Sequence, residues 1–223
     1  GVGPDFVTMF ASDAVKYIED GYLYDLTDFI EDPEIGIPDF REQITPNLYS
    51  EITQWGNNEI YMFPFALGSE VLFYNKTMFE ELGLEVPTTW EEVETVAKAI
   101  YEAKGIPGFA TDSIIDTFQG WMIQEGSSYL DRETRTVTID EATAIKYLEW
   151  FKKGADEGYF KVSSAYEYNS GAFASQAVGM YVGSAAGIDY AKGPIPAEGE
   201  EGHFVMDCAP LPQAGKVGYI SSW

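Results

Sequence analysis

The chain has 223 residues, of which 45% are hydrophobic, and its 13 basic and 37 acidic residues give a formal net charge of −24. This charge makes nucleic acids and anionic lipid surfaces poor partners, because their phosphate groups are repelled. No apolar run approaches the ~18 residues of a transmembrane helix, and the first residues lack the basic start and cleavage site of a signal peptide. The sequence therefore predicts a globular chain that is cytosolic, already processed or cut from a longer protein.

Signatures of catalysis and metal binding are almost absent. The single histidine, His203, lies in the loop EGEEGHFV, where an exposed position is a simpler expectation than a Ser-His-Asp or Cys-His site. The single cysteine, Cys208, lies in the apolar run HFVMDCAPLP and is expected to be buried. Zinc sites need clusters of Cys and His, so no metal or cofactor is expected. A carboxylate-pair hydrolase stays open, although no spacing among the acidic residues selects a pair.

The first third of the chain predicts two strands and two helices. PDFVTMF, residues 4–10, is a short apolar strand candidate. The helix after it has Ser12 as its N-cap and Gly21 as its stop signal. A second helix is predicted over residues 41–55, followed by the strand EIYMF at residues 59–63.

The segment EVLFYNKTMFEELGLEVPTTWEEV specifies a strand and two helices within a few residues of one another. Asn75 ends the strand, and the helix KTMFEEL is closed by Gly83. The next helix begins with Thr89 and Glu92 at capping-box spacing and runs to about Lys104. Such dense boundary signals predict a tightly defined connection.

The remaining elements continue to alternate between strand and helix. GIPGFAT predicts a turn and a short strand, DTFQGWMIQEGSS a partly buried helix, and ETRTVTID a hairpin or edge strand. Asp140 caps a long helix whose apolar stripe is expected to pack in the core: Ala144, Ile145, Leu148, Phe151 and Ala155. A short helix capped by Asn169, the strand AVGMYV, the helix GSAAGIDYA and the strands HFVMDCAPLP and KVGYISSW complete an α/β pattern.

Four segments follow one another in a fixed order: GVGPDFV with the helix SDAVKYIEDGYLYDLTDFI, then YMFPFALGSEVLFYNKTMFEELGLEVPTTWEEV, TVTIDEATAIKYLEWFKKGADEGYF and AFASQAVGMYVGS. The second segment combines a proline-marked strand, a YNK triad and a P-x-T-W-E-E helix start. Together the four resemble the extracellular solute-binding proteins of family 1, which serve carbohydrate ABC importers and include maltose-binding protein.

The resemblance implies an α/β, two-lobed fold of the periplasmic-binding-protein type II. Residues 1–69 would form part of the first lobe, residues 70–215 the second lobe, and residues 216–223 the strand that crosses back. Full members also carry an export signal, an earlier strand and helix, and several helices after the return strand. The chain is therefore expected to be a central fragment with an incomplete first lobe, which leaves open whether it closes on a ligand.

The resemblance also implies where a ligand would bind. Sugar rings stack on aromatic faces, and their hydroxyls need directional hydrogen bonds. Candidate ligand contacts lie after the first strand, on the crossing strand, at a helix start, in a glycine loop and after the return strand: Phe10, Ser12 and Asp13; Gly68, Ser69 and Glu70; Asp116, Gln119 and Trp121; Gly183 and Ser184; and Trp223. Packing or a surface position is the alternative for each.

The function implied is capture of a carbohydrate in an inter-lobe cleft and delivery to ABC transporter permease subunits. A monomer that is not an enzyme is expected, located outside the cytoplasm at the cell surface, as a lipoprotein or in the periplasm. Two alternatives stay open: a surface interaction or sensory module that uses the same fold, and a carbohydrate-active hydrolase. The sequence does not name the sugar.

Overall fold

The computed structural model describes residues 3–55, 58–65, 68–127, 129–131, 134, 136–164, 167–215 and 218, together with all their side chains except that of Ser12. The chain divides into two compact units, Gly1–Leu67 and Gly68–Trp223. The predicted final strand KVGYISSW falls on residues of which only Gly218 is described. Among the described residues, no helix has the length and apolar character needed to span a bilayer.

The described part of the first unit contains the helices α1 (Ala11–Glu19), α2 (Thr27–Ile30), α3 (Phe40–Gln43) and α4 (Pro46–Ile52). Its small core is formed by Ile30, Phe40, Ile52 and Ile60. Helix α1 begins at Ala11 with Phe10 at the N-cap position, two residues before the predicted cap. The α4 helix starts at a proline and is capped by Thr45, whose side chain accepts from the Leu48 N–H. This break divides the single helix predicted over residues 41–55.

The strands predicted at residues 4–10 and 59–63 do not form in the described part of the first unit. A strand needs a neighbouring strand for its backbone groups. Ile60 instead accepts a hydrogen bond of 2.7 Å from the Leu26 N–H, and its own N–H donates to the side chains of Asp25 and Thr27. The backbone of this segment is therefore satisfied by the start of α2.

The second unit is built on a sheet with the strand order β2-β5-β1-β6. Its strands are β1 (Glu70–Asn75), β2 (Phe109–Thr111), β5 (Met180–Ser184) and β6 (Met206–Pro210), and β1 is antiparallel to both of its neighbours. Strand β2 is parallel to β5. A hairpin of β3 (Leu130–Asp131) and β4 (Thr136–Val137) stands apart from this sheet, as predicted for ETRTVTID.

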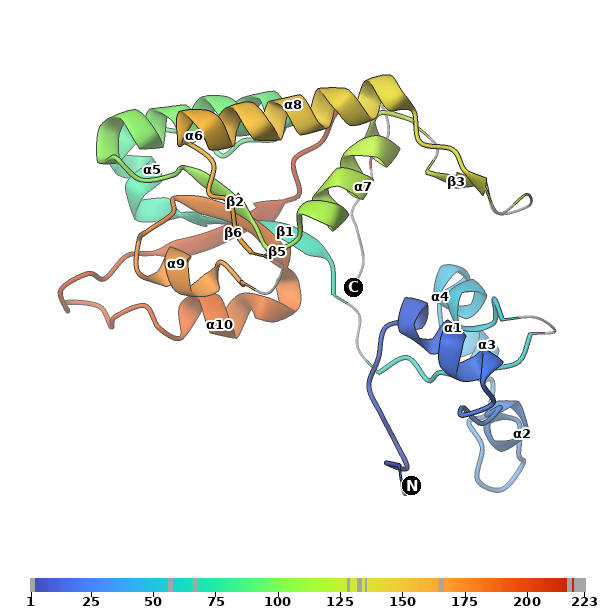
Figure 1. The fold of residues 1–223 in the computed structure, drawn as a ribbon. Coiled ribbons are helices and arrows are strands. Elements are labelled where there is room, and N and C mark those ends of the chain that lie inside the picture. The colour runs from blue at the N-terminus through green and yellow to red at the C-terminus, as the bar shows by residue number, and fades with distance from the viewer. Residues whose placement is uncertain are drawn as a thin grey trace. The chain divides into compact units, whose positions relative to one another are not determined.

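Helices cover both faces of this sheet (Figure 1). On one face lie α6 (Trp90–Lys104), α7 (Ile114–Gln124) and α8 (Glu141–Glu157); on the other lie α9 (Ser170–Ala174) and α10 (Ile188–Lys192), which follows the short 3₁₀ helix η1 (Ala185–Gly187). Two clusters of buried hydrophobic residues form the core of this unit, and alternate side chains of β1 enter them. Leu72 and Tyr74 belong to one cluster, and Phe73 belongs to the other.

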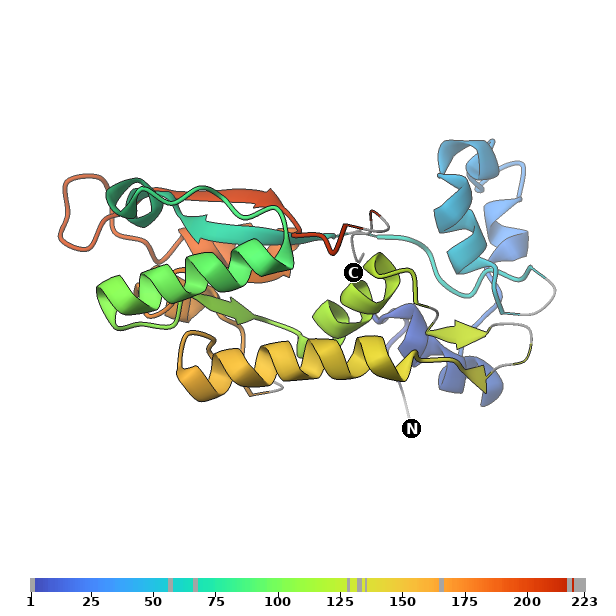
Figure 2. The same ribbon diagram turned by 90° about the horizontal axis from the view of Figure 1, so that it is seen from above.

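The capping signals predict the helix boundaries around β1 correctly. Helix α5 (Lys76–Leu82) begins where the Asn75 side chain accepts from the Met78 N–H, and it ends at Gly83, which has a left-handed φ of 65°. Thr89 and Glu92 form the predicted capping box at the start of α6. Helices α6 and α8 run side by side (Figure 2), joined by an ion pair of 2.8 Å between Glu94 and Lys153.

The apolar stripe predicted on α8 is partly wrong. Its Asp140 cap is present, accepting from the Thr143 N–H at 2.8 Å. Phe151 is buried as expected, but Ile145 is 45% exposed and Leu148 is 53% exposed. The helix instead turns Tyr147 into the core. There it joins an aromatic cluster of Trp90, Phe109, Trp121, Tyr147, Trp150 and Phe160, whose larger side chains fill the space that the aliphatic stripe was expected to occupy.

Cys208 is exposed, so the expectation that it is buried is wrong. It lies on β6, which forms the outer edge of the sheet, and only Met206 and Ala209 of this strand pack against the cores. A run of apolar letters does not reveal which strand will take the edge position. His203 is half-buried, and its Nδ1 lies 2.8 Å from the Pro196 carbonyl oxygen.

Candidate functional site

One end of the main sheet gathers polar side chains from several elements. Because β1 runs antiparallel to β5, its first residue, Glu70, pairs with Ser184 at the end of β5. Strand β2 runs parallel to β5 and ends at Thr111, so Asp112 follows at the same end of the sheet. We call Glu70, Asp112, Asp116 and Ser184 the acidic sheet end.

Asp112 is fixed by hydrogen bonds from Asn169. The Asn169 backbone N–H donates to Oδ1 at 2.6 Å, and its side-chain amide donates to the same oxygen at 3.1 Å and to the Thr111 carbonyl at 3.0 Å. Burial raises the pKa of Asp112, although the Asn169 hydrogen bonds and the charge of Lys161 act in the opposite direction. A methyl group at Gly183 would overlap with Oδ2 of Asp112, so the glycine makes room for this carboxylate.

The first turn of α7 brings Asp116 to the acidic sheet end. Ser113 caps the helix by accepting from the Asp116 N–H at 3.1 Å. The hydroxyls of Thr111 and Thr117 lie 2.7 Å apart, and Thr117 donates to the Ser113 carbonyl at 2.8 Å. These bonds tie the start of the helix to the end of β2, while Asp116 itself stays half-buried.

The backbone amides after β5 are already partly engaged. The Ala185 N–H donates to the Ser69 carbonyl at 2.8 Å, and the Ser184 hydroxyl accepts from the Ala186 N–H at 3.3 Å. Ser69 and Ser184 are thereby brought together. The sequence predicted ligand contacts at Gly183 and Ser184 of this glycine loop, and the amides of the next two residues serve the protein's own backbone and cap.

Glu70 is the buried member of the group. It is 1% exposed, and neither of its carboxyl oxygens has a hydrogen-bond partner among the residues that the structure describes. Desolvation, followed by the charges of Asp116 and Asp112, raises the pKa of Glu70 to about 8. Burial, with a smaller contribution from Glu70, also raises the pKa of Tyr147 on α8. The carboxyl group of Glu70 is therefore neutral at physiological pH.

The other predicted residues lie in different surroundings. Gly68 is half-buried next to Ser69, and Gln119 is half-buried on α7. Trp121 is 2% exposed, with its ring centroid 5.7 Å from Trp90 and 5.1 Å from Trp150, a position that favours packing. Phe10 and Asp13 are exposed at the start of α1 in the first unit. The Ser12 side chain and Trp223 lie outside the described part of the chain.

Five predicted residues are thus collected at one sheet end: Ser69, Glu70, Asp116, Gly183 and Ser184. Asp112 and Asn169 belong to the same arrangement but were not predicted as site residues. A signal for Asp112 was present, since it follows directly after a strand, and ligands of α/β proteins often bind beyond strand ends. Asn169 gave no such signal, because its partner is 57 residues away.

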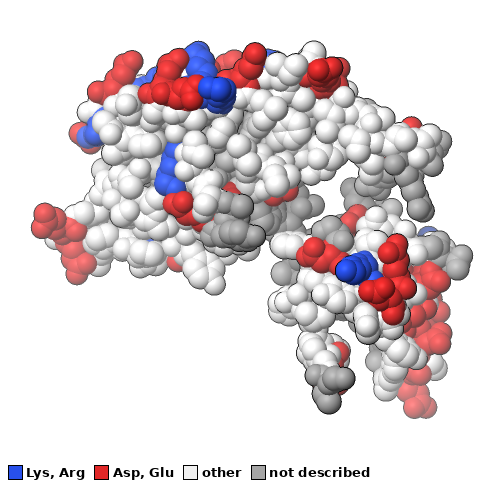
Figure 3. All heavy atoms as spheres, in the orientation of Figure 1, with Lys and Arg blue, Asp and Glu red and all other residues white. Residues whose placement is uncertain are grey.

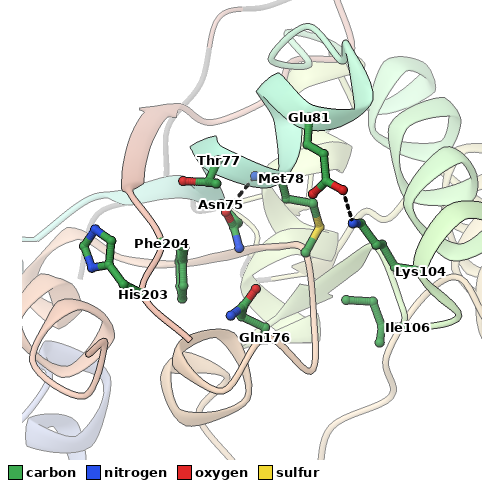
Figure 4. Close-up of a pocket in the computed structure, with 9 residues that line it drawn as sticks. All are labelled: Asn75, Thr77, Met78, Glu81, Lys104, Ile106, Gln176, His203 and Phe204. Atoms are coloured by element: carbon green, nitrogen blue, oxygen red, sulfur yellow. Dashed lines mark hydrogen bonds and ion pairs between the residues drawn. The ribbon is translucent and has the colours of Figure 1, made fainter. Parts of the chain in front are cut away.

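A cavity of about 260 Å³ lies near the other end of β1 (Figure 4). Lys104 and Glu81 form an ion pair of 2.7 Å across one side, and the Asn75 side-chain oxygen is engaged in capping α5. Gln176 and His203 also line it. The Gln176 side chain donates to a nearby backbone carbonyl, and the His203 ring contacts another. None of the predicted ligand residues lines this cavity. Within the described ranges, no group of three His, Cys, Asp or Glu is placed to hold a metal ion.

Acidic and basic side chains are mixed along two long helices of the second unit. On the face shown in Figure 3, acidic and basic side chains are interspersed over α6 and α8. Glu94, for example, lies 2.7 Å from Lys98 and 2.8 Å from Lys153. This intermixing fits a solvated surface rather than a dedicated cation-binding face.

Many known proteins are similar to this chain, including the following three. The multiple sugar-binding protein of Streptococcus mutans is 33% identical over 94 residues, which cover 42% of this chain and 20% of that protein. The arabinooligosaccharide-binding protein of Halalkalibacterium halodurans is 29% identical over 108 residues, which cover 47% of this chain and 23% of that protein. The solved structure of the GacH receptor of Streptomyces glaucescens has a TM-score of 0.75 at 22% identity, covering 95% of this chain and 53% of that one.

The architecture of this chain is that of the α/β, type II periplasmic-binding-protein-like proteins, and the chain spans about half the length of the GacH receptor. Residues 1–223 match the bacterial extracellular solute-binding proteins, and the chain belongs to this family. The resemblance inferred from its four segments is confirmed. The family is extracytoplasmic, and the relatives above are binding proteins by name rather than enzymes.

Proposed function

We propose that this protein captures a carbohydrate outside the cytoplasm and delivers it to an ABC importer. The observation that carries this proposal is that five residues predicted as ligand contacts gather at one sheet end, in a chain whose whole length matches the solute-binding family. Two relatives are named as binding proteins for sugars or arabino-oligosaccharides, and the GacH receptor was crystallised with acarbose. The substrate class proposed here follows these names.

The chemistry of the acidic sheet end supports a neutral, hydroxyl-rich ligand. The Asp116 carboxylate and the Ser184 hydroxyl accept hydrogen bonds, and saccharide hydroxyls both donate and accept. The negative charges of Asp112 and Asp116, which act on Glu70, would repel an anionic ligand. A phosphorylated or carboxylated solute is therefore disfavoured at this place.

The remaining assignments belong to the same proposal. Residues 1–69 and 70–215 correspond to the first and second lobes, and residues 216–223 to the return strand. Phe10, Ser12, Asp13, Gly68, Gln119, Trp121 and Trp223 stay predictions of ligand contact. The protein acts as a monomer that docks on permease subunits, is held at the cell surface by a lipid anchor or moves freely in a periplasm, and binds without turnover.

The test is a calorimetric titration of the chain with maltotriose, acarbose and arabinotriose at pH 7. One of these saccharides is expected to bind and to raise the melting temperature by mass action. Asp116→Asn should weaken binding at least tenfold, because the variant replaces an ionised acceptor that hydrogen-bonds more strongly than an amide. Asp156→Asn, an exposed position near the end of α8, is the matched control and should bind as the unmodified chain does.

A chain that is folded but binds none of the three saccharides would contradict the carbohydrate assignment. Release of reducing sugar from a bound oligosaccharide would instead support the hydrolase alternative. These two outcomes are separated by assaying the same samples for reducing ends after titration.

A further inference from the structure

The unpartnered carboxyl of Glu70 requires an explanation. Both of its oxygens are buried, and neither has a hydrogen-bond partner within the described ranges. Native proteins pair the large majority of buried polar side-chain atoms, since an unmade hydrogen bond leaves the cost of removing the group from water uncompensated. The side chains nearest along its strand are apolar, because Leu72 and Tyr74 share its face of β1.

Among the residues that the structure describes, the titratable groups that act on or lie near Glu70 come from three elements and are not cations. Asp116 on α7 and Asp112 after β2 act on it as negative charges. Tyr147, on α8, is the third titratable neighbour. Lys161 acts on Asp112, whose Oδ1 already receives both N–H groups of Asn169. Burial and these two acids keep Glu70 protonated, with its pKa raised to about 8.

A protonated Glu70 supplies what the other carboxyl groups lack. Ionised carboxylates only accept hydrogen bonds, whereas a carboxylic acid also has one O–H donor. The Ala185 and Ala186 amides are engaged with Ser69 and Ser184, so those two backbone donors are already used. A ligand hydroxyl has lone pairs to satisfy as well as a proton to give. Of the acidic sheet end, Glu70 is the carboxyl group that burial keeps protonated, so it can supply such a donor once a ligand hydroxyl reaches it.

We propose that Glu70 binds the carbohydrate as a neutral acid, donating its proton in a hydrogen bond to a ligand hydroxyl, so that capture weakens when this acid ionises. The inference rests on the proposed function and adds to it a specificity-determining residue and a dependence on pH. It selects neutral polyhydroxylated ligands over cationic ones, because a cation would favour the ionised form of Glu70.

The direction of the pH effect follows from proton linkage. If only the protonated form binds, affinity is nearly constant below the pKa of about 8 and falls tenfold per pH unit well above it. Between pH 7 and pH 9 the expected loss is about tenfold. A ligand with a permanent positive charge that paired with an ionised Glu70 would show the opposite trend, with affinity rising toward alkaline pH.

The experiment titrates the unmodified chain with maltotriose, acarbose and arabinotriose at pH 6, 7, 8 and 9, with choline, which stays positively charged at every pH, as the cationic probe. Glu70→Gln keeps a neutral donor and acceptor of similar shape but cannot ionise. We expect its affinity profile to be flat from pH 7 to pH 9, whereas the unmodified chain loses about tenfold. Glu102→Gln, at an exposed position on α6, is the matched control and should keep the unmodified profile.

The outcomes separate the two proposals. Saccharide binding with the same affinity at pH 7 and pH 9 would overturn the role of Glu70 and leave carbohydrate capture intact. A loss of affinity between pH 7 and pH 9 that persists in Glu70→Gln would also overturn the role of Glu70 and leave carbohydrate capture intact. Tighter binding of choline at higher pH would overturn the neutral-acid role in favour of an ionised one. Absence of saccharide binding at every pH, in a folded chain, would remove both proposals.

Discussion

The indole N–H of Trp90 donates a hydrogen bond of 2.7 Å to Oε1 of Gln124, and neither residue is exposed. The same oxygen accepts from the Ala214 N–H at 3.0 Å, and the Gln124 amide donates to the Pro212 carbonyl at 3.1 Å. One buried side chain therefore joins α6, α7 and the segment that follows β6.

Replacing Gln124 with leucine should destabilise the second unit by about 2 to 4 kcal/mol, because an indole N–H, a backbone N–H and a carbonyl lose their partner in the core. Urea unfolding followed by tryptophan fluorescence measures the effect. Gln119→Leu, at a half-buried position on the same helix, is the control and should change stability by less than about 1 kcal/mol. Equal losses in both variants would contradict the importance of the buried bonds.

Glu70 should make the ligand-free protein less stable as the pH rises. The unfolded chain loses the Glu70 proton near pH 4.5, whereas the folded chain keeps it up to about pH 8. Over this window the folded state binds more protons, so the free energy of unfolding falls with pH and levels off above 8. Glu70→Gln should remove this slope and be the more stable form at pH 8. Parallel pH curves for the two proteins would show that Glu70 is not held neutral.

Glu94 should have the opposite effect at acid pH. Desolvation acts to raise its pKa, but the hydrogen bonds and charges of Lys153 and Lys98 outweigh it and lower the pKa to about 2. Its contribution to stability is therefore present above pH 4.5 and lost as the pH falls toward 2. Glu94→Gln should be less stable at pH 7 and should flatten the acid limb of the curve, measured by the urea midpoint between pH 2 and pH 5. Glu102→Gln should retain that limb.

Gly183 should not tolerate a side chain. A methyl group there would overlap with the Asp112 carboxylate and lie 2.9 Å from Cε2 of Tyr181. Gly183→Ala is expected to cost about 1 to 3 kcal/mol, as overpacking usually does, and to loosen the Asp112 to Asn169 contact. Gly187→Ala is the comparison, since a methyl group at Gly187 meets nothing within 4 Å. Similar urea midpoints for both variants would rule out the steric argument.

The features that could be predicted from the sequence are those that act over a few residues. The side chains of Thr89 and Asp140 accept from N–H groups three positions ahead, and the helices begin where these caps predict. The strand at residues 59–63 failed because strand formation depends on a partner, and the start of α2 binds that backbone instead. Such competition between segments that are distant in sequence cannot be predicted from the residues of either segment alone.

In the candidate site, too, local sequence patterns could be predicted and contacts between distant segments could not. Glu70 and Ser184 come from motifs that resemble a known family, and the register of β1 and β5 brings them opposite each other. Asn169 was predicted only as a helix cap, yet its side chain makes no capping bond and turns to Asp112. The exposure of Cys208 likewise depends on strand order, which a single strand's sequence does not contain.

The stacked indoles give the protein an optical reporter of its own. Trp121 lies 5.7 Å from Trp90 and 5.1 Å from Trp150 by ring centroids, and it shares with Asp116 a helix of 11 residues, about 16 Å long. A ligand that displaces the first turn of α7 must either tilt the helix relative to Trp90 and Trp150 or bend it. Either response changes the distance between indoles, so intrinsic fluorescence can follow events at the acidic sheet end without any added dye.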